Sequence, residues 1–220
     1  ALICAASGLF LSLAANAQTN GDFRSTATGN WNDVTIWQRY QGGAWRNPGQ
    51  TGNNPGQYPG QNTGTQTVTI RNGHEVTINV SPANAIINLS VENGGILIFG
   101  NNNTARTLNV SGNIEIDAGG TFRSRTAGST VNTLNAGGNF TNDGTVDFTA
   151  SSFVNTVFTN TAGTKTISGT GTTFVFNNIT LEAGNVATTL VSTASISANA
   201  VTIGAPSDAN KNKLLQVNGG

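Results

Sequence analysis

The chain has 220 residues, of which only 9% are charged, and its ten acidic side chains balance its ten basic ones. A net charge of zero, with the basic residues scattered, gives no electrostatic footprint for nucleic acid or for an anionic membrane surface. The balanced charge and the β-branched residues in almost every phrase also argue against disorder. We therefore expect a folded, β-rich protein with no nucleic-acid partner.

Residues 1–17 have the pattern of a secretory signal peptide. Leu2–Ala15 is apolar but short for a membrane span, and Ala15-Asn16-Ala17 matches a small-residue cleavage site. A buried N-terminal helix is the alternative. Because the single cysteine, Cys4, lies in this segment, the mature chain would contain neither a disulfide nor a cysteine metal site. We expect an extracellular or cell-surface protein whose mature chain has no membrane span.

Residues 18–64 differ in composition from the rest of the chain. They hold all three tryptophans and both tyrosines: Trp31, Trp37, Tyr40, Trp45 and Tyr58. Their many Pro, Gly, Asn and Gln residues are unfavourable in helices and interior strands. We predict an irregular aromatic N-terminal cap over the open end of the core, ending in a Pro/Gly/Asn-rich surface loop. Trp31 and Trp37 are assigned to the core.

Residues 65–220 consist of short runs that alternate apolar and polar residues and end at Asn-Gly, Gly-Gly, Ser-Gly or Ser-Pro turns. Ile96 with Ile98, and Ile114 with Ile116, are two such alternating pairs. The phrases recur at intervals of roughly 20–30 residues, which predicts an all-β parallel β-helix (β-solenoid) of about six or seven coils. An antiparallel β-sandwich is the alternative, but it leaves the recurrence of Asn beside Gly at the corners unexplained. The repeats are expected to continue beyond residue 220 in a longer chain.

Two groups of phrases resemble known families. The pair Trp31…Trp37, the phrase Val68…Ile78 and the phrase Gly94-Gly95-Ile96-Leu97 resemble the all-β domain family named for its eight recurrent glycines. The phrases in 164–184 are similar to repeats of large surface proteins that Bacteroidota export by type IX secretion, as is Gln18 directly after the cleavage site. These resemblances imply a right-handed parallel β-helix in an extracellular, adhesin-like protein.

Charged residues alternate with apolar ones on two expected strands and one further coil. They form a possible surface polar strip: Glu115, Asp117, Arg123, Arg125 and Asp147. Such a strip suits a binding face, and it equally suits the solvation of outward strand faces. Because Thr, Ser and Asn surround these carboxylates, we expect no raised pKa among them.

The chain lacks the motifs of sugar-cleaving and metal-binding β-helices. Its only histidine, His74, lies in a turn, and no calcium-binding Gly-Gly-x-Gly-x-Asp repeat is present. We expect no catalytic residues, no cofactor and no metal. Tyr40, Trp45 and Tyr58 are possible glycan-binding residues, because exposed aromatic rings stack on sugars.

The sequence thus predicts a non-catalytic structural or adhesive module of a secreted or cell-surface protein. The alternatives are a carbohydrate-binding module or part of a polysaccharide-degrading protein. The expected partners are extracellular polysaccharides or surface glycans.

Overall fold

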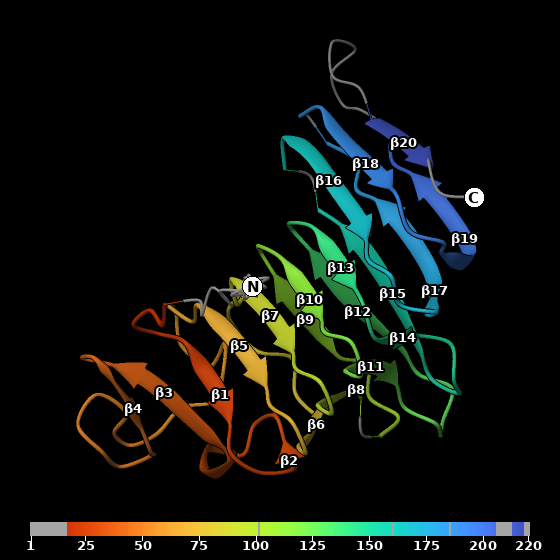
Figure 1. Cartoon of the computed structure of the whole chain (residues 1–220). Helices are drawn as coiled ribbons and strands as arrows, with labels where there is room; N and C mark the ends of the chain where they lie inside the picture. The colour runs from red at the N-terminus through yellow and green to blue at the C-terminus, as the bar shows by residue number, and fades with distance from the viewer. Residues whose placement is uncertain (1–16, 101, 160, 185, 206–212, 218–220) are drawn as a thin grey trace, which may run out of the picture.

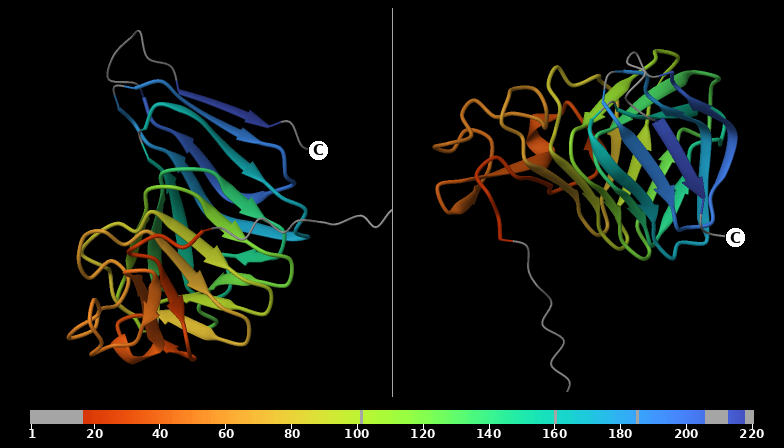
Figure 2. Two further views of the ribbon diagram at one scale, coloured as in Figure 1. Left: turned by 60° about the vertical axis from the view of Figure 1, so that its left-hand side comes forward. Right: turned by 90° about the horizontal axis from the view of Figure 1, so that it is seen from above.

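The computed structural model describes residues 17–100, 102–159, 161–184, 186–205 and 213–217. Within these ranges the chain is all-β and winds into a β-solenoid of about 6 turns, as predicted. One 3₁₀ turn, η1 (Val34–Ile36), interrupts the strands, and no α-helix occurs in the described ranges. The coils stack along one axis, with the N-terminal strands at one end and the last strands at the other (Figures 1 and 2). The expected signal peptide lies outside the described residues, except for Ala17.

Sheet A forms one side of the solenoid and receives one strand from each coil. Its parallel strands, in order along the axis, are β1 (Phe23–Ser25), β5 (Thr67–Ile70), β7 (Asn88–Val91), β10 (Ile114–Ile116), β13 (Phe140–Asn142), β16 (Gly163–Ser168), β18 (Thr188–Ser192) and β20 (Lys213–Val217). Beyond β1 the sheet continues through an antiparallel hairpin, β3 (Trp37–Gln41) and β4 (Ala44–Arg46).

Sheet B covers the other sides as two parallel ladders joined by one long strand. The first ladder is β2 (Gly29–Asn30), β6 (Glu75–Ile78), β8 (Ile96–Phe99), β11 (Thr121–Ser124) and β14 (Thr145–Asp147). The second is β9 (Thr107–Val110), β12 (Val131–Ala136) and β15 (Phe153–Phe158). The long strand β17 (Thr173–Leu181) pairs with β14 through its first residues and with β15 through its last ones. Strand β19 (Ser197–Ile203) then pairs with β17.

The strand register confirms the repeats seen in the sequence. Leu134 pairs with Leu108, and Thr121 pairs with Ile96 on one side and Thr145 on the other. These pairings are parallel, so the antiparallel sandwich is wrong. Because every residue faces its counterpart in the next coil, each position of the repeat forms a row along the solenoid axis.

The Asn-Gly and Gly-Gly corners stack on one another. Gly94 and Gly119 adopt the left-handed conformation, with φ of 74° and 85°. A Cβ atom at Gly94 would lie 2.8 Å from Oδ1 of Asn72 in the preceding coil. Its backbone angle favours glycine at this corner, and a Cβ atom would also force the Asn72 side chain to move.

Inward side chains of both sheets form one core with a run of phenylalanines along the axis. Ile114 and Ile116 are buried as expected, and Phe99 stacks on Phe122 with 6.1 Å between ring centroids. In β8 the inward residues are Leu97 and Phe99, which belong to the core, and not the alternating pair Ile96 and Ile98, although Ile98 is also buried. Four apolar residues in succession carry no alternation of their own, so pairing with the neighbouring coils decides which face is inward.

The first part of 18–64 is more regular than the predicted irregular cap. Strands β1 and β2 already pair in parallel with β5 and β6, so they belong to the coil ladder. Trp31 and Trp37 are buried as expected, and their Nε1 atoms donate hydrogen bonds to the carbonyl oxygens of Pro59 and Trp31, each at 2.9 Å.

One charged side chain points into the core. Lys165 on β16 is buried, pairs with Leu190 of the next coil, and donates to the Gly137 carbonyl and the Thr161 hydroxyl. Burial, followed by the charge of Lys213, lowers the pKa of Lys165. Its ammonium group therefore has partners, but it remains in a poorly solvated position.

The register of β10 gives a direct test of the fold. We expect Ile116→Asp to lower the free energy of unfolding by about 3 kcal/mol or more, since it places an unpaired charge in the core. Glu115→Ser, on the exposed face of the same strand, should change it by less than about 0.5 kcal/mol. Urea denaturation of both variants measures the difference, and the opposite ranking would contradict the register.

Candidate functional site

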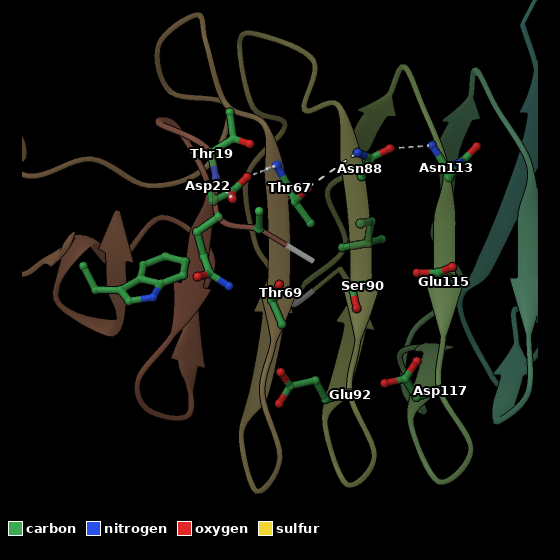
Figure 3. Close-up of a pocket in the computed structure, with 14 residues that line it drawn as sticks. Thr19, Asp22, Thr67, Thr69, Asn88, Ser90, Glu92, Asn113, Glu115 and Asp117 are labelled. Atoms are coloured by element: carbon green, nitrogen blue, oxygen red, sulfur yellow. Dashed lines mark hydrogen bonds between the residues drawn. The ribbon is translucent and has the colours of Figure 1, made fainter. Parts of the chain in front are cut away.

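A groove of about 640 Å³ crosses the outer face of sheet A, with strands β5, β7 and β10 as its floor (Figure 3). The segment 17–19 and the side chain of Trp45 complete its lining near the N-terminal end. Because the strands are parallel and in register, the outward side chains of the floor form three rows that run along the solenoid axis.

The first row, which we call the ladder row, consists of Thr67, Asn88 and Asn113. Asn88 Oδ1 accepts from the backbone N–H of Asn113 at 2.9 Å, and its Nδ2 group donates to Thr67 Oγ1 at 3.5 Å. Asp22 extends this row, because its carboxylate accepts from the backbone N–H groups of Thr67 and Thr19. The polar groups of the ladder row are thus mostly occupied in linking one coil to the next.

The second row, the middle row, consists of Thr69, Ser90 and Glu115. Thr69 pairs with Ser90, and Ser90 pairs with Glu115, so the three side chains follow one another across three coils (Figure 3). None of the three side chains makes a hydrogen bond within the described part of the chain, although each has polar atoms that can bond to a ligand. Their hydroxyl and carboxylate groups therefore face the groove without a hydrogen-bond partner in the described part of the chain.

The third row, the acidic row, consists of Glu92 and Asp117, one residue beyond strands β7 and β10. Partial burial, followed by the charges of Glu92 and Asp143, raises the pKa of Asp117 above its ordinary value. The expectation that no carboxylate pKa is raised is therefore wrong at Asp117. The repeat itself causes this, because it places acidic residues at the same corner of three successive coils.

The predicted aromatic residues do not form one site. Tyr40 and Trp45 face each other across the β3–β4 hairpin, with their ring centroids 5.3 Å apart, and Trp45 lines the groove. The Arg24 guanidinium lies 4.3 Å from the Trp45 ring centroid, on the β1 side. Tyr58 is not part of the groove lining and packs against the hydrophobic core.

The predicted polar strip is divided between two faces of the solenoid. Glu115 and Asp117 lie at the groove on sheet A, whereas Arg123 pairs with Asp147 on sheet B. Arg123 also makes a long ion pair with Glu75 at 3.9 Å, and it lines a smaller hollow with Arg125. The single strip is wrong because the turn after Asp117 takes the chain round a corner before β11 begins.

His74 lies beside a serine hydroxyl of the first coil. The Ser25 hydroxyl accepts from the backbone N–H of Arg71 at 2.9 Å and lies 2.9 Å from His74 Nδ1. In the described ranges no three His, Cys, Asp or Glu residues are grouped so that they could hold a metal ion. None of the described helical segments has the length and apolar character needed to cross a membrane.

No family model, curated protein or solved structure matches this chain. The candidate site therefore depends on the geometry of the groove. Sequence reasoning missed Thr69, Ser90 and Glu92, which are ordinary residues for an outward strand face. Their equal spacing from one coil to the next was the available signal, since residues at equivalent repeat positions form one row.

The raised pKa of Asp117 predicts a pH-dependent stability. The ionised carboxylate is less favourable in the folded chain, so Asp117 lowers the free energy of unfolding above its folded-state pKa. This cost disappears as the pH falls below the unfolded-state pKa, where Asp117 is protonated in both states. We expect Asp117→Asn to be slightly more stable than the parent at pH 7, by less than about 1 kcal/mol, and to lose this advantage near pH 3. Urea denaturation across this range measures the effect, and a gain that persists unchanged at low pH would contradict it.

Proposed function

We propose that this chain is a non-catalytic adhesive module of a secreted or cell-surface protein and that it holds an extended glycan in the sheet A groove. The observation that carries the proposal is the middle row. Thr69, Ser90 and Glu115 present unused polar groups in a line, and Trp45 lines the same groove. Polar groups that fix hydroxyls, together with an aromatic ring that can stack on a sugar, are the elements of a carbohydrate site.

The direction of the groove supports a polymer. The rows run across the strands, so equivalent side chains recur at the strand spacing of about 4.8 Å. A linear polysaccharide offers one sugar ring after another at a comparable interval.

The location outside the cell is supported by the sequence. A cleavage site follows the apolar leader, and the later repeats resemble those of exported Bacteroidota surface proteins. A module that projects from a cell and binds glycans would act as an adhesin. The alternative is a purely structural stalk, in which the groove has no ligand.

The carboxylates of the groove do not require a catalytic role. Glu115 and Asp117 lie two residues apart on the same face of one strand region, and both are exposed. A glycosidase instead places two carboxyl groups on opposite sides of the bond that is cleaved. We expect the purified chain to release no reducing or unsaturated ends from neutral or acidic polysaccharides. Turnover that is lost in Glu115→Gln would overturn the non-catalytic part of the proposal.

The position of the aromatic residues gives a test of glycan binding. We expect Trp45→Ala to weaken retention on immobilised polysaccharide at least about tenfold, because stacking on the accessible part of this half-buried ring is lost. Tyr58→Ala should lower the melting temperature instead, because its ring packs on the core. Affinity electrophoresis and thermal melts of both variants separate the two effects.

The matched control is Glu75→Gln, which removes a carboxylate from sheet B and leaves the groove unchanged. This variant should be retained like the parent. If no polysaccharide in a broad panel retains the parent, the glycan proposal fails, and the alternative of a purely structural stalk is favoured.

A further inference from the structure

The groove lining is acidic, although the chain as a whole has no net charge. The whole chain has zero net charge, yet the lining contains Asp22, Glu92, Glu115 and Asp117 and no Lys, Arg or His. The Asp22 carboxylate is compensated by two backbone N–H donors. The Glu92 carboxylate also accepts from a backbone N–H group, that of Asn72 at 3.2 Å. The negative charge that is open to a ligand therefore lies mainly on Glu115 and Asp117, on the β10 side of the groove.

The nearest cations, Arg24 and Arg71, lie on the β1 and β5 side of the groove, close to Glu92 but away from Glu115 and Asp117. Arg24 on β1 lies beneath the Trp45 ring and donates to Gln38 Oε1 at 2.8 Å. Arg71 follows β5. Burial, followed by the charge of Arg71, lowers the pKa of Arg24, and the charge of Glu92 opposes this shift. Neither guanidinium lines the groove beside Glu115 or Asp117. An anionic ligand would meet these two carboxylates without compensation, whereas a cationic group would pair with them.

We infer that the ligand of the sheet A groove is a linear polymer of amino sugars whose amines are free and protonated. The inference rests on the proposed function, because it names the class of glycan that the groove holds. A sugar ring would contact Trp45, the middle row would bond to hydroxyls, and an ammonium group would lie between Glu115 and Asp117. From β1 to β10 there are three strand spacings, or roughly 14 Å, so about three or four sugar units would fill the groove.

A basic peptide fits the floor less well than an amino-sugar chain. Peptides commonly bind sheets by pairing with a free edge, but β5, β7 and β10 are each paired on both sides. Only side chains are therefore available to a ligand here. An extended peptide repeats its side chains on one face every 6.5 Å or so, which does not match the row spacing, whereas a sugar polymer presents a ring at nearly each row.

Isothermal titration calorimetry with four probes tests the inference on the full chain. The probes are a glucosamine tetramer, an N-acetylglucosamine tetramer, a galacturonic acid tetramer and a lysine tetramer. The titrations are made at a pH of about 5.5, at which the sugar amine is protonated. We expect the glucosamine tetramer to bind at least about tenfold more tightly than its N-acetylated counterpart, as a charge-assisted bond would provide. The galacturonic acid tetramer should not bind.

The variants distinguish the inference from the proposed function. Glu115→Gln and Asp117→Asn should each weaken binding of the glucosamine tetramer about tenfold and leave the N-acetylated tetramer unchanged. Glu75→Gln on sheet B should affect neither sugar. Trp45→Ala should weaken both sugars, because stacking does not depend on the amine.

Three results would overturn the inference. Equal binding of the two amino sugars, weakened in Trp45→Ala but not in Glu115→Gln, would retain glycan binding and remove the role of the amine. Tighter binding of the lysine tetramer, unchanged in Trp45→Ala, would assign the groove to basic peptides. Binding of none of the sugars would remove the glycan function together with the inference.

Discussion

The structure depends on backbone hydrogen bonds between successive coils. These bonds run along the solenoid axis, and they hold only if each residue lies above its counterpart in the preceding coil. The requirement explains the composition of the chain: small turn residues recur at the corners, β-branched and aromatic residues recur in the core, and few charges are needed. It also makes the coils interdependent, because no coil buries its inward side chains without its neighbours. The phenylalanine contacts from Phe99 through Phe122 and Phe148 to Phe176 follow the same axis.

The groove is a direct product of this register. Thr69, Ser90 and Glu115 would be unrelated surface residues in another fold, but here one ladder brings them into a line. The same ladder accounts for the electrostatics, since acidic residues at one corner position are forced to be neighbours. In a repeat fold, polar residues at the same position of successive repeats therefore form an extended surface row. Substitution of one row position alters one site in the line and leaves the other rows in place.

Much of the fold could be predicted from the sequence, and the site only in part. Alternation at Ile114 and Ile116 gave the correct inward face, and the recurring Leu-Asn and Gly-Gly phrases gave the register between coils. Alternation could not resolve Ile96–Phe99, where all four residues are apolar and the neighbouring coils decide the orientation. The predicted polar strip is divided between sheets A and B, and the prediction missed this because the sequence does not show how sharply the chain turns at the corner after Asp117. The groove itself was missed, because it requires the β3–β4 hairpin and the segment 17–19 to lie beside strands that follow much later in the chain.

Strand β17 has a consequence for how the molecule would respond to mechanical force. Elsewhere in the middle coils, separate strands serve the two ladders of sheet B, but β17 continues from one ladder into the other. Strand β19 pairs along both parts of β17, so the last coil also has one strand that spans both ladders. If the chain is pulled from its C-terminal end, β20 can detach from β18 alone, whereas β19 and then β17 each engage both ladders. At β17 both ladders must yield together. Strands β17 and β19 would therefore act together as a mechanical clamp, and tension applied at the C-terminal end would leave the N-terminal coils that carry the groove folded.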